Sequence, residues 1–120
     1  MKDISMGVLE TQFANIIWEK EPISSTQLSK ISEIEIGWKK TTSYTVLKRL
    51  CEKGIFQNQR GQVTSLISKD QFYSMQSEKF VEETFDGSLP AFLAAFTSRK
   101  KLTESELEQL KRMINEFDEE

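Results

Sequence analysis

The chain has 120 residues and a net charge of −3, and 38% of its residues are hydrophobic. It contains no histidine and one cysteine, so it lacks the residues for histidine-dependent catalytic triads, for most zinc sites and for an internal disulfide. No apolar run approaches the roughly 18 residues that span a bilayer, and residues 1–5 lack the pattern of a signal peptide. We therefore expect a cytoplasmic protein that does not insert into a membrane, is not an enzyme, and needs no metal or cofactor.

Charge is distributed unevenly along the chain. Residues 1–36 hold three basic and six acidic side chains, residues 37–60 hold six basic and one acidic, and residues 61–120 hold seven basic and twelve acidic. A basic segment between acidic flanks suits a DNA-reading element, because it attracts phosphates locally while the rest of the protein stays off the duplex. On charge alone, however, an ordinary solvated basic helix is the simpler interpretation.

The first third of the chain predicts two helices. The first helix is expected over residues 8–19, because four apolar residues recur at helical spacing: Leu9, Phe13, Ile16 and Ile17. Glu21 and Pro22 end it, because the residue before a proline is disfavoured in the helical region. Ser24 followed by Gln27 forms a capping box, which predicts a second helix over residues 25–33.

A third helix and a hairpin follow. The third helix is predicted over residues 40–53 and ends at Gly54, a natural left-handed cap. Residues 55–59 and 63–68 are predicted to form two short strands around a polar turn at residues 60–62. Three helices and then a hairpin are typical of a winged helix-turn-helix protein, in which the third helix enters the major groove and the hairpin touches the DNA backbone.

The helical wheel of the third helix separates two faces. The predicted core face carries Ser43, Val46, Leu47 and Leu50. The opposite face carries Thr41, Tyr44, Thr45 and Lys48. Threonine can donate or accept a hydrogen bond or present its methyl group to thymine, and lysine pairs with guanine or phosphate. This composition favours a DNA-reading face over a generic solvent face, which would more often alternate glutamate and lysine.

The last third of the chain is rich in large apolar side chains. Residues 69–86 and 89–96 carry many of them, and Thr103 with Glu106 forms a capping box that opens a last helix. About fifty residues cannot bury this many apolar groups alone, so we expect a second copy of the chain, rather than the chain's own winged helix, to cover them. The expected dimerisation residues are Phe80, Phe85, Leu89, Phe92, Phe96, Leu107, Leu110 and Ile114.

Together these patterns predict a mostly α protein with a small β-hairpin. We expect a winged helix-turn-helix DNA-binding domain over residues 1–69 and a helical dimerisation region over residues 70–120. Cys51, near the end of the third helix and beside its core face, is interpreted as a packing residue rather than a redox switch.

Several short motifs, taken in order and spacing, resemble one known family. They are residues 17–20 and 22–24 near the start, residues 38–42, Thr45, Leu47, 49–50 and 53–54 in the third helix, and residues 87–89, 95–96 and 102–106 in the last third. Over nearly its whole length the chain resembles the penicillinase-repressor family, the regulators of β-lactamase and methicillin-resistance genes in Gram-positive bacteria.

The resemblance implies a homodimer that binds a palindromic double-stranded DNA operator and blocks transcription. By position, the family's DNA contacts fall on Thr41, Thr42, Tyr44, Thr45 and Arg49. With the basic side chains around them, the expected DNA-binding residues are Lys39, Lys40, Thr41, Thr42, Tyr44, Thr45, Lys48, Arg49 and Arg60.

The chain departs from the family's pattern at three places. The family's Ser-Pro-Lys reads as residues 39–41 here, Lys-Lys-Thr, so the lysine has moved by one position, or about 100° around a helix. Tyr44 stands where a basic residue is usual, and Thr11 stands where a tryptophan is usual. The helix and its placement in the groove should survive these changes, whereas the operator sequence need not be the family's.

The resemblance also implies how repression ends. The β-lactam type is cut by a membrane sensor metalloprotease within the dimerisation region, and the matching bond here is Ala95–Phe96. Ordinary core packing also accounts for both residues, so both interpretations stay open. Copper-responsive relatives carry C-terminal Cys-x-Cys pairs, which this sequence lacks, so metal sensing through thiolates is not expected.

Other functional classes compete with a repressor. The main alternative is a winged-helix module that binds proteins and not DNA, for which the net acidity and the altered third helix leave room. A small hydrolase is disfavoured because nothing supplies a base and a nucleophile together. A sensor with a ligand pocket at the dimer interface is a further alternative, although the sequence shows no polar cluster to orient a ligand.

Overall fold

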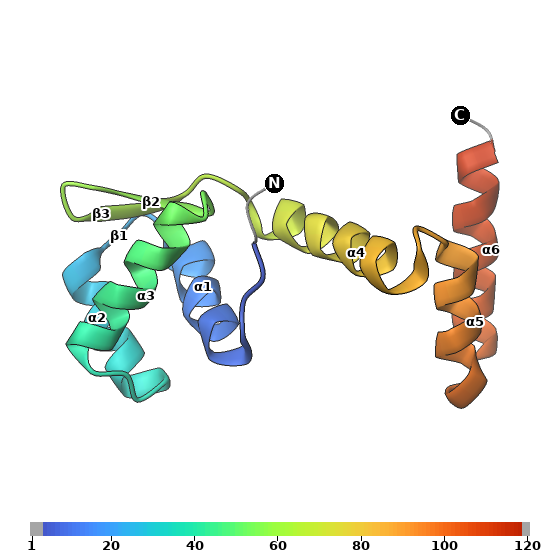
Figure 1. Ribbon diagram of the computed structural model, residues 1–120, viewed down its shortest axis with the longest axis horizontal. Helices are drawn as coiled ribbons and strands as arrows, with labels where there is room; N and C mark the ends of the chain where they lie inside the picture. Colours follow the sequence, from blue (N-terminus) through green and yellow to red (C-terminus); the bar gives the residue numbers. More distant parts are fainter. Residues whose placement is uncertain (1–3, 119–120) are drawn as a thin grey trace. The chain divides into compact units, whose positions relative to one another are not determined.

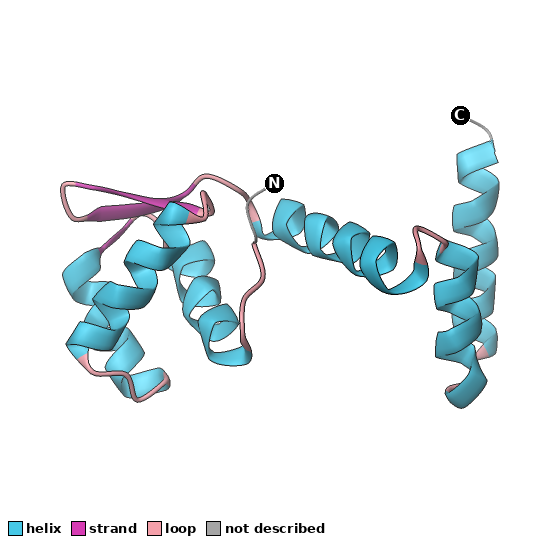
Figure 2. Ribbon diagram, viewed as in Figure 1, coloured by secondary structure: helices cyan, strands magenta, loops and turns pink. Residues whose placement is uncertain are grey.

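The computed structural model describes residues 4–118. Within that range the elements are α1 (Val8–Lys20), β1 (Ile23–Ser24), α2 (Ser25–Glu35), α3 (Lys40–Glu52), β2 (Phe56–Gln59), β3 (Gln62–Ser65), α4 (Lys69–Phe85), α5 (Leu89–Arg99) and α6 (Glu104–Asp118) (Figure 1, Figure 2). This mostly helical chain with one small antiparallel sheet confirms the predicted fold class. The predictions about a signal peptide and about C-terminal cysteines rest partly on residues 1–3 and 119–120, which lie outside the described residues.

The chain divides into two compact units, Met1–Ser77 and Glu78–Glu120. The first unit contains α1 to α3, the sheet and the first half of α4, and the second contains the rest of α4 with α5 and α6. The boundary expected between residues 69 and 70 falls at the start of α4. Along residues 4–118, none of the helices combines the length and the apolar character that crossing a bilayer requires.

The core of the first unit lies between its three N-terminal helices and the sheet. Phe13 and Ile17 of α1 are fully buried, together with apolar residues of α3 and the hairpin: Leu50, Ile55, Phe56 and Val63. The predicted helix over residues 8–19 is confirmed to within one residue. Leu9, however, is 50% exposed, because the first turn of α1 extends beyond the core.

The N-cap of α2 and the glycine cap at the C-terminus of α3 form at the residues predicted from the sequence. The backbone N–H of Gln27 donates to Ser24 Oγ at 3.1 Å, which confirms the N-cap of α2. After the C-terminal end of α3, Gly54 adopts a positive φ of 82°. Its N–H donates to the Cys51 carbonyl oxygen, and the Ile55 N–H donates to the Leu50 carbonyl oxygen. This pair of bonds is a Schellman motif, which satisfies the last carbonyls of α3 and turns the chain into the hairpin.

The wing is a three-stranded sheet in the order β1-β3-β2, with both pairs antiparallel. Its turn has two residues, Arg60 and Gly61, with φ of 55° and 83°. The three-residue turn predicted from the sequence is therefore wrong by one position, because Gln62 already pairs with Gln59. Two positive φ values in a two-residue loop define the turn that matches the twist of a hairpin.

Strand β1 was not predicted from the sequence. It contains only Ile23 and Ser24, which pair with Val63 and Gln62 of β3. Two residues are too few for the alternation by which a strand is recognised. The strand places the start of α2 beside the wing, where the Ser25 N–H donates to the Gly61 carbonyl oxygen.

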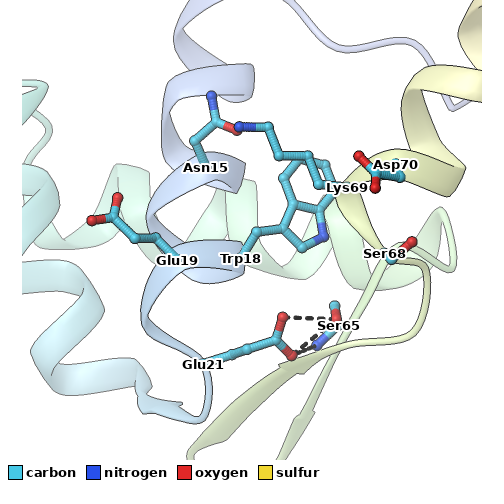
Figure 3. A pocket seen from close by; sticks show the side chains of 8 residues that line it. All are labelled: Asn15, Trp18, Glu19, Glu21, Ser65, Ser68, Lys69 and Asp70. Atoms are coloured by element: carbon cyan, nitrogen blue, oxygen red, sulfur yellow. Dashed lines mark hydrogen bonds between the residues drawn. The ribbon is translucent and has the colours of Figure 1, made fainter.

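Trp18 of α1 joins the hairpin to the start of α4. Its indole Nε1 donates a hydrogen bond to the Ile67 carbonyl oxygen at 3.0 Å. Its ring centroid lies 5.2 Å from that of Phe56 and 5.5 Å from that of Phe72. Figure 3 shows the Trp18 indole beside the first turn of α4. The first half of α4 is therefore a packed part of the winged-helix unit and not a free linker.

The second unit is organised around phenylalanine side chains. The ring centroid of Phe92 in α5 lies 6.1 Å from that of Phe80, 5.7 Å from that of Phe85 and 6.1 Å from that of Phe96. These contacts join the end of α4 to α5. Even so, no side chain of α5 or α6 is buried along the described length of those helices.

The capping box predicted before α6 is confirmed. The N–H of Thr103 donates to Glu106 Oε1 at 2.9 Å, and the N–H of Glu106 donates to Thr103 Oγ1 at 3.1 Å. The bond from the Thr103 backbone holds the pKa of Glu106 below its ordinary value. Two backbone donors at the start of the helix are thereby satisfied.

We expect Phe72→Ala to lower the free energy of unfolding of the first unit by about 3–5 kcal/mol, because the fully buried ring would leave a cavity beside Trp18. Tyr73→Ala is the matched control: the residue is 39% exposed and its ring meets Phe72 only edge-on, with centroids 5.7 Å apart, so we expect a loss of about 1 kcal/mol. Urea unfolding followed by tryptophan fluorescence measures both, because Trp18 and Trp38 lie in the first unit. A loss by Phe72→Ala as small as that expected for Tyr73→Ala would show that α4 does not belong to this core.

Candidate nucleic-acid interface

Helix α3 presents two different faces, as the helical wheel predicts. Its core face is buried: Ser43, Val46, Leu47 and Leu50. On the opposite face Thr41, Thr45 and Lys48 are exposed and Tyr44 is half-buried. The Thr45 hydroxyl donates to the Thr41 carbonyl oxygen at 2.9 Å, so its methyl group and its free lone pairs are left for an outside partner.

Cations surround this face. Lys39 is the N-cap residue of α3 and Lys40 its first residue, and both are exposed. Lys48 and Arg49 are exposed further along the helix, and Arg60 is exposed in the turn of the wing. Glu52 lies at the C-terminal end of the helix. All the residues expected to contact DNA, Thr42 included, are therefore exposed or half-buried on α3, its N-cap and the wing turn.

Tyr44 links α3 to the start of α2 and, through it, to the wing. Its hydroxyl donates to Ser25 Oγ at 3.3 Å, and the Ser25 N–H donates to the Gly61 carbonyl oxygen at 2.8 Å. Hydrogen bonding to the side chains of Ser25 and Thr26 holds the pKa of the Tyr44 hydroxyl below its ordinary value. The exposed face of α3, the N-terminus of α2 and the wing turn are therefore tied together.

Arg49 links the other side of α3 to α1. Its Nη1 lies 3.8 Å from Glu10 Oε2, and the two side chains are 51% and 22% exposed. A pair at this distance, with the arginine exposed and the glutamate half-buried, contributes about 1 kcal/mol or less. The ion pair limits where the Arg49 guanidinium points. Even when one N–H of the guanidinium faces Glu10, the other four donors of the arginine can bind a further partner.

A hollow of about 380 Å³ lies between α3 and the wing strand β2. We call it the wing hollow, and it is lined by Tyr44, Leu47, Lys48, Cys51 and Asn58. Burial, reinforced by the nearby Glu52 carboxylate, raises the pKa of the Cys51 thiol above its ordinary value. The neutral thiol packs against the core, in agreement with its interpretation as a packing residue.

Three residues of this region were missed from the sequence. Ser25 is adjacent to a recognised N-cap, but nothing in the sequence indicates that the wing folds back onto it. Asn58 sits in a run of amides, which predicts polarity but not a place beside Lys48. Glu10 is one of many carboxylates, and only the packing of α1 beside α3 brings it to Arg49.

A second hollow, of about 510 Å³, lies elsewhere in the first unit, near Trp18 (Figure 3). Glu21 there accepts hydrogen bonds from the Ser65 backbone N–H and hydroxyl, each at 2.9 Å. Its charged lining residues are three carboxylates and one lysine: Glu19, Glu21, Asp70 and Lys69. This surplus of negative charge makes it unsuitable for phosphate, so α3 and the wing remain the candidate nucleic-acid interface.

Three helices followed by a hairpin wing, with a polar and basic face on the third helix, define a winged helix-turn-helix protein. The sequence model of the penicillinase repressor matches residues 6–116. The chain therefore belongs to the penicillinase repressor family, whose members are transcriptional repressors and not enzymes. The resemblance found in the sequence motifs is confirmed.

Individual relatives are distant but cover almost the whole chain. The methicillin resistance regulatory protein MecI of Staphylococcus aureus is 24% identical over 118 residues, which are 95% of this chain and 96% of the relative. The penicillinase repressor of Staphylococcus aureus is 22% identical over 124 residues, covering 97% and 95%. The penicillinase repressor of Bacillus licheniformis is 23% identical over 111 residues, covering 89% and 87%.

Proposed function

We propose that this chain is a sequence-specific repressor that binds a palindromic operator as a homodimer. The observation that carries the proposal is the division of α3 into a buried apolar face and an exposed face of hydroxyls and cations. An exposed helix face of this kind fits the major groove, where base edges present donors, acceptors and the thymine methyl group. The exposed Arg60 in the wing turn supplies a cation for the DNA backbone.

The net charge of −3 does not oppose this proposal. The basic side chains around α3 and the wing are local, and charges more than about 8–10 Å apart are largely screened at physiological salt. Acidic side chains are concentrated before residue 37 and after residue 60. Each N-terminal unit therefore offers a basic surface on the proposed DNA-binding side.

A second copy of the chain is the proposed cover for the second unit. Phe80, Leu89, Phe96, Leu107 and Ile114 are each between 43% and 56% exposed. Leaving side chains of this size in water forgoes about 25 cal/mol for each Å² of apolar surface. Burial between two chains would recover part of that free energy, and a two-fold dimer also places two copies of α3 on the two halves of a palindrome.

The alternative of a protein-interaction module predicts different behaviour in salt. Binding of DNA through several phosphates weakens steeply as salt rises, with a slope of about −0.9 for each phosphate contact in a plot of log K against log salt. Binding of a protein partner through apolar contacts has no such dependence. The basic surface around α3 favours the DNA-binding proposal.

We expect Thr45→Ala and Arg49→Ala to weaken binding to the operator without loss of fold. Thr45 lies on the exposed face, where one single-point hydrogen bond to a base contributes about 0.5–1.5 kcal/mol, or roughly 2- to 13-fold in affinity. Loss of a phosphate contact by Arg49 should also reduce the salt slope by about 0.9. Arg112→Ala removes an exposed arginine from α6 and is the matched control. Fluorescence anisotropy on a duplex recovered by genomic binding measures all three, and wild-type binding by both α3 variants would contradict the assignment of this face.

We expect Leu110→Asp to break the dimer, because it would place an unpaired carboxylate among the apolar side chains of α6. Gln109→Asp is the matched control, since it adds the same charge at the adjacent, exposed position. Light scattering after size exclusion gives the mass of each variant. A wild-type chain that elutes as a monomer at micromolar concentration would contradict the proposed assembly.

Cleavage at Ala95–Phe96 by a membrane metalloprotease is the proposed route of relief. Both side chains are exposed on α5 of the single chain, whereas the proposed dimer would cover Phe96, so the protease would need the dimer to open at this helix. The bond lies inside the helix, where the Phe96 carbonyl oxygen accepts from the Lys100 N–H at 3.3 Å, so cutting requires local unwinding. We expect a fragment ending at Ala95 in induced cells, detected by mass spectrometry, and an intact chain in relieved cells would exclude this route.

A further inference from the structure

Tyr44 differs chemically from its neighbours on the exposed side of α3. The other outward side chains of the helix's first two turns are hydroxyls and a cation: Lys40, Thr41, Thr42 and Thr45. The tyrosine brings a large apolar ring into a surface otherwise suited to polar contacts. It is half-buried and not fully solvated.

The ring is held in place at two points. The hydroxyl bonds to Ser25 Oγ at 3.3 Å, and Lys40 Nζ lies 6.0 Å from the ring centroid, at the edge of the range for a cation–π contact. Ser25 is itself bonded through its N–H to Gly61 in the wing turn. A side chain anchored in this way loses little further conformational freedom when it contacts a partner.

The surroundings of the ring are apolar at the base and polar at the rim. Leu47, 3% exposed, and the neutral thiol of Cys51 line the wing hollow beside Tyr44. Lys48 and Asn58 supply the charged and the amide side chain that line the wing hollow. In the major groove the base edges offer donors, acceptors and one apolar group, the C5 methyl of thymine. A thymine methyl is the feature of DNA that matches an anchored aromatic ring in such a hollow.

We propose that Tyr44 is a specificity-determining residue whose ring contacts a thymine methyl group in each half of the operator. The inference rests on the proposed DNA binding and adds the base that the ring selects. Ser25 is a positioning residue, because it acts on DNA only through the Tyr44 hydroxyl.

The test uses the full chain and changes single methyl groups. Duplexes are selected from a randomised library by the wild-type protein, and each thymine of the selected sequence is then replaced in turn by deoxyuridine, which lacks only the methyl. We expect one position in each half-site where this replacement weakens wild-type binding by about fourfold, the value of one buried methyl group. At that position Tyr44→Ala should show less than about a twofold difference between thymine and uracil.

Further variants separate the ring from its anchor. Tyr44→Phe keeps the ring and should retain the discrimination against uracil, with a smaller overall affinity, and Ser25→Ala should behave in the same way. Tyr73→Ala is the matched control, since Tyr73 has Lys69 Nζ 5.9 Å from its ring centroid but lies on α4; it should discriminate like the wild type. If Tyr44→Ala fails to fold, as judged by thermal unfolding, Tyr44→Arg replaces it with the same expectation.

The outcomes separate this inference from the proposed function. Failure of the wild-type chain to select any sequence would overturn DNA reading itself. Selection of a sequence in which no thymine distinguishes wild type from Tyr44→Ala would overturn the inference about Tyr44 and leave the repressor intact. An equal loss by Tyr44→Ala on every duplex, with thymine or uracil, would place the ring against the sugar-phosphate backbone and would also overturn it.

Discussion

Burial of Val46, Leu47 and Leu50 fixes the rotation of α3 about its own axis. Turning the helix by a third of a circle would expose these side chains and bring further hydroxyls or an ammonium group into a core that already holds the Ser43 hydroxyl. An unpaired hydroxyl there costs about 1–3 kcal/mol, and a charge costs more. The orientation of the exposed face is therefore set by apolar packing on the far side of the same helix, and every proposed DNA contact of α3 depends on it.

Two side-chain ties then locate α3 between its neighbours. On one side Tyr44 bonds to Ser25, whose N–H bonds to Gly61, so the helix and the wing turn share a connection through the start of α2. On the other side Arg49 lies beside Glu10 of α1. Neither tie is strong, since one is a single hydrogen bond and the other a partly exposed ion pair at 3.8 Å. Their effect is geometric: they restrict side chains whose positions decide what the surface can recognise.

The sequence predicts the local elements well and the long-range contacts poorly. The helix of residues 40–52, its core face and its glycine cap follow from periodicity and one residue type. The N-cap of α2 and the capping box of α6 follow from a spacing of three. Strand β1 has two residues, so no alternation reveals it, and Gln62 was assigned to the turn because polar residues are common in both places. Ser25 and Glu10 join the site through partners 19 and 39 residues away in the chain, and Asn58 lies beside α3 residues 7 to 14 positions before it. Such tertiary neighbours leave no periodic signal.

The lack of buried side chains along α5 and α6, as far as the structure describes them, has a consequence for the cell. On the proposed dimer, the order of the second unit is governed by mass action, so its folded fraction rises with the concentration of chains. A chain that has not met its partner keeps apolar helices in water, and chains in this condition are removed by cellular proteases. The degradation rate of each chain would then depend on the chain concentration: below the dissociation constant of the dimer, monomers would predominate and be cleared faster than the dimers that predominate above it.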